Sequence, residues 1–380
     1  MLNEFQMATK IVSGKDSLRE LNQLTLKKVL LVCDPYMVQS GKSDGLVQRL
    51  AESGIECTIF SDITPDPTIE IVTKGLVSAL SVEPDGIIAL GGGSAIDAAK
   101  AIRYIYQIVH QDMAISLICI PTTSGTGSEV TSFSVISDPT SDSKYALVDK
   151  KMIPDIAILD PQLVLTVPKH ITADTGIDVF THCIEALVST KANDFTDANS
   201  EKAITIIWNN LVTAYNDGDN LAIRESIHNA SCLAGIAFNE ASLGICHSLS
   251  HALGGRFHLP HGRVNAMLLP HVISYNAELE NDRETDNLEK YCRIAGVLGI
   301  QSGTAKSTVY AFISKLKRLM KQLELPQSIE EFGINQQDFL EAIPEMAEKA
   351  MQDKCTLTNP RKPQQADLEM IYRKLLRGGY

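Results

Sequence analysis

The stretch that decides the fold of the first half of the chain is DGIIALGGGSAIDAAKAIRYIY, residues 85–106. An apolar run, three glycines and a segment with helical spacing predict a buried strand, a tight turn and a helix. Glycine lets the backbone approach a ligand closely, and the free N–H groups at a helix start suit a phosphate. Ser94 and Asp97 are spaced as a capping pair for this helix. A purely structural turn is the alternative, because the pattern is not the G-x-G-x-x-G fingerprint.

A second loop of the same kind favours a ligand site. ICIPTTSGTGSEVT, residues 118–131, is an apolar run followed by small and hydroxylated residues. Open α/β sheets bind ligands at the carboxyl ends of their strands, so two such loops favour a dinucleotide or another phosphorylated ligand. Asp34 ends the run VLLVCD. Its carboxylate suits the ribose hydroxyls of NAD, although a turn-forming role ahead of Pro35 explains it equally well.

Strand-like and helical patterns divide the chain into two parts. Up to residue 168, apolar runs alternate with helical patterns, which predicts βαβ units around a parallel sheet. The runs are KKVLLVCDP, ECTIFSD, DGIIALGGG, ISLICIPTT, FSVISDP, KYALVD and DIAILDP, and the helical patterns lie at 41–53, 68–81 and 94–109. Beyond Pro168 only helical spacing is found, near 171–190, 195–216, 221–243, 263–277, 284–298, 304–323 and 336–351. We expect a Rossmann-like α/β dinucleotide-binding domain at 1–168 and an all-α metal-binding domain at 169–380.

Composition and charge limit the classes of function. The 380 residues carry a net charge of −12, which argues against binding to nucleic acid. The sequence shows no signal peptide and no apolar run near the length of a membrane span. The eight cysteines contain no C-x-x-C pair, which is typical of reduced cysteines and argues against a zinc site of the usual thiolate spacing. We therefore expect a cytoplasmic protein that acts on small molecules.

Four of the nine histidines lie in HSLSHALGGRFHLPH, residues 247–261. His247 and His251 are four residues apart and share a helix face, as do Asp178 and His182 in DTGIDVFTHCIEALVS. His261 begins the following segment. Carboxylate and imidazole donors without sulfur suit Fe2+, Zn2+, Mn2+ or Co2+.

Simpler explanations exist for the same residues. The stripe formed by Asp174, Asp178, His182 and Glu185 is also the pattern of a solvated helix face. The other histidines have no helical partner, and we expect them to be structural or exposed. They are His110, His170, His228, His258 and His271.

These motifs make the chain resemble the iron-containing (group III) alcohol dehydrogenases along nearly its whole length. The resemblance is carried by GGGSAIDAAK, PTTSGTGSEVT, GIDVFTHCIEA and HSLSHALGGRFHLPHGRVNAMLLPH. The segments SDITPDPT, DFTDANSEKA and GGRFHLPHG are most similar to the 1-propanol dehydrogenases of propanediol-utilisation microcompartments. The resemblance implies NAD(H)-dependent interconversion of short primary alcohols and aldehydes, first of all propanol and propionaldehyde or ethanol and acetaldehyde.

The resemblance also implies roles for individual residues. It assigns the metal, Fe2+ or Zn2+, to Asp178, His182, His247 and His261, and a proton relay to His251. It implies that the cofactor lies against Asp34, Gly91, Gly92, Gly93, Ser94, Asp97, Thr122, Thr123, Ser124, Gly125, Thr126 and Lys144. It implies a substrate cleft edged by Phe238, Leu243 and Cys355. Two departures bear on the substrate: Asp66 stands where many relatives have Asn, and Phe133 replaces an Asn or a smaller residue.

Several other functions are alternatives to a short-chain alcohol dehydrogenase. Within the same family, the chain could be a lactaldehyde/1,2-propanediol or a 1,3-propanediol oxidoreductase. A lyase of the dehydroquinate-synthase type needs a basic pocket, whereas only Lys191, Lys202, Arg224 and Arg256 are basic between Asp178 and His261. A non-catalytic microcompartment component would show eroded motifs. The resemblance also leads us to expect a homodimer or larger homo-oligomer, compatible with residence in a bacterial microcompartment.

Overall fold

The computed structural model describes residues 5–110, 114–139, 143–281 and 284–376. The chain divides into two compact units. The α/β unit comprises Gln6–Val167 and Gly218–Gly235, and the helical unit comprises Pro168–Asp217 and the chain from Ile236 onward. The domain boundary expected after residue 168 stays a prediction. The grouping of residues 218–235 with the α/β unit is a feature that helical spacing alone did not indicate.

Six parallel strands form the centre of the α/β unit, and five of them correspond to predicted apolar runs. The six strands are β1 (Lys10–Ser13), β2 (Lys28–Cys33), β3 (Glu56–Phe60), β4 (Gly86–Gly91), β5 (Ser116–Pro121) and β8 (Ile156–Leu159), in the order β1-β8-β5-β4-β2-β3. The sixth, β1, was not among the predicted runs, because its four residues KIVS are largely exposed and form no long apolar run. The chain runs outward from β2 to β3 and then returns to β4 on the other side of β2. The strand order therefore reverses between β2 and β4, which is where open α/β sheets bind ligands.

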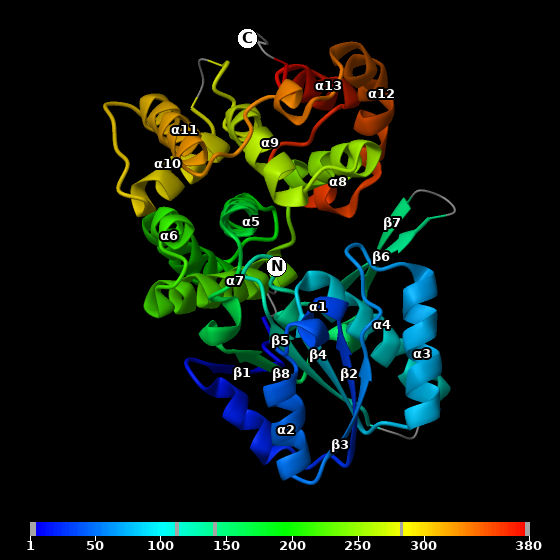
Figure 1. Ribbon diagram of the computed structural model, residues 1–380. Helices are drawn as coiled ribbons and strands as arrows, with labels where there is room; N and C mark the ends of the chain where they lie inside the picture. Colours follow the sequence, from blue (N-terminus) through cyan, green and yellow to red (C-terminus); the bar gives the residue numbers. More distant parts are fainter. Residues whose placement is uncertain (1–4, 111–113, 140–142, 282–283, 377–380) are drawn as a thin grey trace. The chain divides into compact units, whose positions relative to one another are not determined.

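Alternate residues of each central strand are buried on opposite faces of the sheet. On β2, Leu30 and Val32 pack with α3 and α4, whereas Val29 and Leu31 pack with α2. Figure 1 shows α3 and α4 on one side of the sheet and α2 on the other. Burial on both faces explains why these strands are uninterrupted apolar runs. The helical segments of residues 6–167 are η1 (Ser17–Gln23), α1 (Pro35–Gln39), α2 (Asp44–Glu52), α3 (Ile69–Val82), α4 (Gly93–Val109), η2 (Ser128–Val130), η3 (Lys150–Met152) and η4 (Pro161–Val164).

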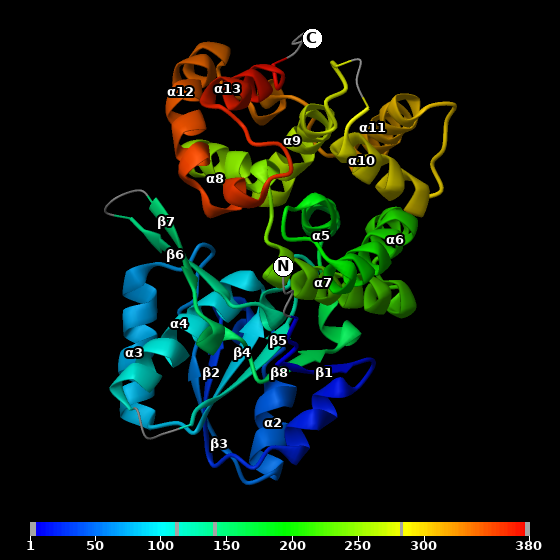
Figure 2. The same cartoon turned by 180° about the vertical axis from the view of Figure 1, so that it is seen from behind.

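Two of the expected strands do not join the parallel sheet. β6 (Phe133–Asp138) and β7 (Ser143–Val148) pair antiparallel with each other, with Ser137 opposite Lys144, and form a separate hairpin that Figure 2 shows from behind. A parallel pairing needs a crossover of a dozen or more residues, and the short connection between FSVISDP and KYALVD cannot supply one.

The helical unit confirms the change of pattern after Pro168, since its described residues include no strand. α5 (Lys169–Val188) packs on α6 (Asp194–Asn216) and α9 (His261–Asn276), and α8 (Ile245–Phe257) packs on α9 and α12 (Gln336–Gln352). α7 (Leu221–Ala241) is one continuous helix that belongs to the α/β unit up to Gly235 and to the helical unit from Ile236. The other helical segments are α10 (Asp286–Val297), α11 (Ala305–Gln322), η5 (Ile329–Phe332), η6 (Lys354–Thr358) and α13 (Gln365–Arg373). None of the described helices is long and apolar enough to cross a membrane.

Candidate metal and cofactor sites

Three helices of the helical unit bring the expected metal ligands together. Asp178 and His182 lie one turn apart on α5, His247 lies in the first turn of α8, and His261 begins α9. Asp178, His182 and His247 are buried, as is Glu185 on the same face of α5. The stripe on α5 is therefore not a solvated face. Asp174, its first member, pairs with Arg263 at 2.9 Å, whereas Asp178 and His182 face the other expected ligands.

The donor atoms converge on one carboxylate oxygen. Asp178 Oδ1 lies 3.8 Å from Nε2 of His182, 3.6 Å from Nε2 of His247 and 3.5 Å from Nε2 of His261. Donors around a tetrahedral ion with bonds of about 2.1 Å are about 3.4 Å apart, so these separations fit a shared ion. The donor atoms of Asp178, His247 and His261 all lie within 4.8 Å of one another.

His182 is not part of that three-residue group, although it lies beside it. Its ring stacks on that of His247 with 4.7 Å between the centroids. Its buried Nδ1 makes no hydrogen bond with the described residues. Nε2 of His182, which faces Asp178 at 3.8 Å, is the atom that would bind an ion shared with these three residues.

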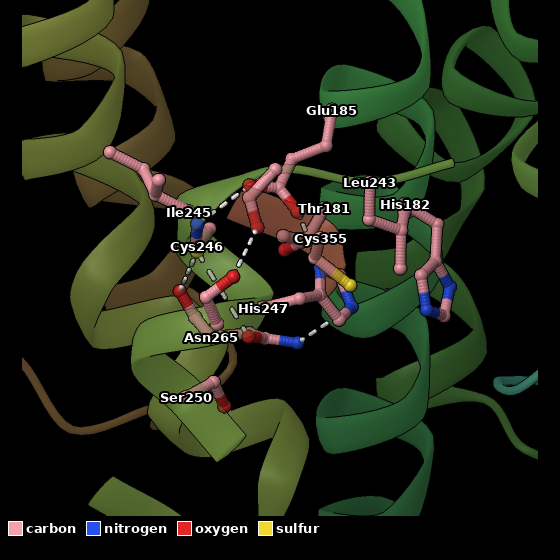
Figure 3. A network of polar contacts seen from close by, with 12 residues as sticks. Thr181, His182, Glu185, Leu243, Ile245, Cys246, His247, Ser250, Asn265 and Cys355 are labelled. Carbon is pink, nitrogen blue, oxygen red and sulfur yellow. Dashed lines mark hydrogen bonds and ion pairs between the residues drawn. The ribbon is translucent and has the colours of Figure 1, made fainter. Parts of the chain in front are cut away.

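Glu185 and Asn265 contact the expected ligands, although the sequence analysis did not assign them to the site. Nδ1 of His247 donates to Glu185 over 2.6 Å, and Glu185 also accepts from the backbone N–H of Cys246 at 2.7 Å. The side-chain amide of Asn265 donates to Asp178 Oδ1 at 2.7 Å. The same amide nitrogen lies 3.3 Å from Nε2 of His247, a contact that Figure 3 marks with a dashed line. A carboxylate on Nδ1 fixes the tautomer of His247 and leaves Nε2 for a metal. The spacing held a signal, since Glu185 follows His182 by three residues and Asn265 follows His261 by four.

The electrostatics of this cluster favour a bound cation. Burial alone raises the pKa of Asp178, yet the imidazoles of His182, His261 and His247 hold it well below its usual range. Burial lowers the pKa of His182 to about 4, so this imidazole is neutral at pH 7 and offers a lone pair. Burial opposes a charge on His247, but the carboxylates of Asp178 and Glu185 raise its pKa to about 9. His247 is therefore protonated at pH 7. Its proton supplies the positive charge near Asp178 and Glu185 that a bound cation would otherwise supply.

His251 lies next to this cluster and has a different environment. Its ring stacks on that of His261 at 5.3 Å between centroids, and its side chain is 43% exposed. Its Nδ1 donates to Asp353 over 2.8 Å. Nε2 is the ring nitrogen of His251 that does not bond to Asp353. Asp353 is a third residue near the site that the sequence analysis missed, because it lies 102 residues away in the chain.

In the α/β unit, the three segments expected at the cofactor meet at one edge of the sheet. Asp34 follows β2, the loop from Gly91 to Ser94 follows β4, and the loop from Thr122 to Thr126 follows β5. β4 is hydrogen-bonded to both β2 and β5, with Cys33 opposite Leu90 and Gly91 opposite Pro121. The segments therefore lie side by side where the strand order reverses.

The two loops contact each other closely enough to require glycine. A Cβ atom on Gly92 would lie 3.2 Å from the hydroxyl oxygen of Thr123, and one on Gly93 would lie 2.7 Å from Cγ2 of Thr126. Gly92 is the N-cap of α4 and has no side chain that could accept from the first backbone N–H groups of the helix. The backbone N–H groups there remain available to an anion.

The expected capping pair of Ser94 and Asp97 is wrong. The Ser94 hydroxyl accepts from the backbone N–H of Asp66, which has a φ of 54° that Asp and Asn both tolerate. Asp97 turns to the interior, where it accepts from the Ser128 hydroxyl at 2.5 Å and the Val135 N–H at 3.1 Å. The carboxylate of Asp97 thus links α4 to η2 and β6.

Two further residues of the expected cofactor set have distinct surroundings. Ser124 lies 2.9 Å from Nδ1 of the buried His228, whose pKa burial lowers to about 4. His228 is thus a structural residue, as expected, and it supports the second loop. The backbone of Lys144 pairs with Ser137 in the hairpin, but the Lys144 side chain lies outside the described part of the structure.

The expected substrate residues lie in the helical unit near the metal cluster. The ring of Phe238 stacks on His182 with 4.5 Å between centroids. Leu243 is buried, and the backbone carbonyl of Leu243 accepts from the Thr358 hydroxyl. Cys355 is half-buried on η6, close to His251 and Asp353.

A dinucleotide-type sheet edge and a buried carboxylate–imidazole cluster define a metal-dependent dehydrogenase class. The iron-containing alcohol dehydrogenase family matches residues 8–161, and its C-terminal family description matches residues 172–376. The chain belongs to this family and is an oxidoreductase that acts on short-chain alcohols, with NAD(H) and Fe2+ as the family's cofactors.

Individual relatives cover the whole chain. The chain is 44% identical over 377 residues to the 1-propanol dehydrogenase PduQ of Citrobacter freundii, covering 99% of this chain and 100% of that protein. It is 39% identical to the NADPH-dependent butanol dehydrogenase of Clostridium saccharobutylicum, covering 97% and 96%. The iron-containing alcohol dehydrogenase of Thermococcus thioreducens has a similar structure, with a TM-score of 0.90, 31% identity and coverage of 99% and 100%. A 1,3-propanediol oxidoreductase gives a TM-score of 0.90 at 32% identity, covering both chains fully.

Proposed function

We propose that the chain is an iron-dependent dehydrogenase that interconverts 1-propanol and propionaldehyde with NAD(H). The observation that carries the metal-dependent chemistry is the convergence of Asp178, His247 and His261 within 4.8 Å, with His182 beside them. The similarity to a 1-propanol dehydrogenase over its full length supports the substrate. Acetaldehyde, lactaldehyde and 1,3-propanediol are the other substrates to be tested.

In this proposal Asp178, His182, His247 and His261 hold Fe2+. The donor set of one carboxylate and three imidazoles also suits Zn2+, which binds such sites more tightly. An ion held there would supply polarisation of a substrate oxygen, and a bound nicotinamide would supply the hydride chemistry. Glu185 orients His247 through Nδ1, and Asn265 orients Asp178 through Oδ1.

The chain's own residues then move the proton and position the substrate. His251 is half-exposed and oriented by Asp353, so it can pass a proton between the substrate hydroxyl and water. Phe238, Leu243 and Cys355 offer a largely apolar surface for a short alkyl chain. The apolar ring of Phe238 also limits the space beside His182.

The edge of the sheet binds the dinucleotide in this proposal. The loops at Gly91–Ser94 and Thr122–Thr126 receive the phosphates and the adjoining groups. The Asp34 carboxylate favours NAD by binding the ribose hydroxyls and repelling the extra phosphate of NADP. Because one 39%-identical relative is NADPH-dependent, this preference has to be measured for the present chain.

The decisive experiment measures NADH oxidation by the anaerobic iron-loaded protein with propionaldehyde, acetaldehyde, lactaldehyde and butyraldehyde. We expect propionaldehyde to give the highest kcat/KM and chelation of iron to abolish the rate. A lyase that recycles its NAD would show no net oxidation of NADH. Equal kcat/KM values for all four aldehydes would contradict the substrate proposal.

The assembly and location of the enzyme are also part of the proposal. We propose a homodimer or larger homo-oligomer that functions in the cytoplasm, inside a bacterial microcompartment. The support for the microcompartment is the similarity of the chain to PduQ proteins. Light scattering of the purified protein, and its recovery with purified microcompartments, test the two statements separately.

A further inference from the structure

A second group of metal-type donors lies beside the proposed iron site. His251 comes from α8, Asp353 from the junction of α12 and η6, and Cys355 from the first turn of η6. One donor atom of each residue lies within 4.8 Å of the others. None of the three is among the proposed iron ligands.

Asp353 organises this group through its carboxylate. One oxygen accepts from Nδ1 of His251 at 2.8 Å, and the other accepts from the backbone N–H of Cys355 at 2.8 Å. The Cys355 thiol interacts with the same carboxylate. Burial alone raises the pKa of Asp353, but His251 and Cys355 hold it well below its usual range. An ionised carboxylate thus faces two groups that each carry a replaceable proton.

We propose that His251, Asp353 and Cys355 form a second metal site that takes a soft divalent cation of the Zn2+ class. The ion bonds to Nδ1 of His251, an oxygen of Asp353 and the sulfur of Cys355, and water completes a tetrahedron. The Cys355 thiol loses its proton to solvent, and the proton of His251 moves from Nδ1 to Nε2. The thiolate and carboxylate together neutralise the two positive charges of the ion.

The geometry and the donor types support this assignment. Tetrahedral zinc bonds of about 2.0–2.3 Å place donors about 3.3–3.6 Å apart. The three donor atoms lie within 4.8 Å of one another, and Nδ1 of His251 and the Asp353 oxygen, now 2.8 Å apart, would separate slightly to admit an ion. The side chain of His251 is 43% exposed, which gives an ion and its water a route of entry. A thiolate selects Zn2+ over Fe2+, whereas the proposed iron site contains no sulfur.

Occupation of this second site has a consequence that rests on the proposed function. An ion on Nδ1 fixes the ring of His251 and removes it from proton transfer. Excess Zn2+ therefore inhibits the iron-loaded enzyme without displacing its iron. The binding of the ion itself does not depend on the reaction.

The experiment titrates the iron-loaded, anaerobic protein with Cd2+, which reports a thiolate bond through an ultraviolet charge-transfer band. We expect a saturable band in the wild type and in Cys292→Ser, the matched control, because Cys292 is a half-buried cysteine on α10. Cys355→Ser should abolish the band, and Asp353→Asn should weaken Cd2+ binding by at least about tenfold. Circular dichroism confirms that each variant is folded.

The same proteins are then assayed with Zn2+, each relative to its own uninhibited rate, while bound iron is measured. Inhibition of the wild type at unchanged iron content, reduced at least tenfold in sensitivity in Asp353→Asn, supports the proposal. A charge-transfer band that survives in Cys355→Ser, or inhibition that only follows iron release, overturns it. If no dehydrogenase activity is found, the proposed function fails, while the Cd2+ band still decides the second site.

Discussion

Asp178 is the residue on which the proposed iron site depends, because three imidazoles approach the same carboxylate oxygen. His261 is the exposed member of the set, with a side chain that is 40% exposed. We expect His261→Ala to weaken Fe2+ binding by about 100-fold or more, because the remaining donors cannot enclose the ion. Iron analysis after gel filtration measures this.

His258→Ala is the matched control for that experiment. His258 lies three residues away, ends α8 with a φ of 54° and belongs to no donor cluster of the described residues. It should keep its iron. Full iron content in His261→Ala would remove His261 from the ligand set.

A substitution of Glu185 tests whether its hydrogen bond to His247 contributes to metal affinity. The change Glu185→Gln keeps the shape of the side chain but removes the charge that accepts from Nδ1 of His247. We expect the affinity for Fe2+ to fall about 10–100-fold, which is the usual effect of losing such a carboxylate. Competition with a calibrated chelator measures the affinity. Glu348→Gln, on an exposed face of α12, should not change it, and equal losses in both variants would contradict the role of Glu185.

Asp34 can be tested without disturbing the turn that it also forms. Its side chain caps α1 by accepting from the backbone N–H of Met37, and Asn caps a helix equally well. Asp34→Asn therefore removes the charge and keeps the cap. We expect kcat/KM with NADPH relative to NADH to rise about tenfold, which corresponds to about 1.4 kcal/mol. An unchanged ratio in both Asp34→Asn and Asp34→Gly would remove Asp34 from the ribose site.

The spacing of residues in the sequence predicted contacts between residues on one helix face, but it did not predict contacts between residues on different helices. The i, i+4 pairs found Asp178 with His182 and His247 with His251, and the structure places both pairs around one cluster. The sequence could not predict the contact of His251 with Asp353, because such contacts depend on how α8 packs on α12 and η6. Whether these residues bind iron stays a prediction.

At the scale of elements, the site depends on the close packing of α9 against α5. A Cβ atom on Gly262 would lie 1.9 Å from the backbone carbonyl oxygen of Asp174, one turn before Asp178. We expect Gly262→Ala to lower the free energy of unfolding by about 3 kcal/mol, because backbone cannot give way as a side chain can. Chemical denaturation measures the change.

Gly296→Ala on α10 is the control, since a Cβ atom there meets nothing within 4 Å. Alanine is the better helix former, so this variant should be unchanged or up to about 1 kcal/mol more stable. A similar loss of stability in both variants would show that the contact of α9 with α5 is not the cause. A loss confined to Gly262→Ala would also predict weaker iron binding.

Periodicity predicted the type of most elements but not every partner. The apolar runs predicted five of the six parallel strands and missed β1, which is short and largely exposed. The runs of β6 and β7 form their own hairpin because their connection is too short for a crossover. The S-x-x-D spacing predicted a cap that the structure does not contain, because the carboxylate of Asp97 is bound by Ser128 and Val135. Local patterns cannot show which distant groups compete for a side chain.

At the scale of the whole molecule, the change from strands to helices after Pro168 was visible in the sequence. The assignment of residues 218–235 to the α/β unit was not, because α7 is a continuous helix with one helical pattern along its length. Helical spacing shows that a face is buried but not which unit buries it.

Because the proposed iron and dinucleotide sites lie in different units, each ligand should stabilise a different part of the chain. Ligand at 100 times its Kd stabilises the form that binds it by about 2.7 kcal/mol, which slows amide exchange about 100-fold where exchange requires that form to open. With Fe2+ we expect this protection in α5, α8 and α9, and with NAD in the loops that follow β4 and β5. Hydrogen–deuterium exchange of the chelated protein, before and after each addition, measures both patterns. Protection of α5 by Fe2+ should disappear in His261→Ala, whereas protection of the glycine loop by NAD should persist. Iron that protects β4 as strongly as α5 would contradict the assignment of the two ligands to separate units.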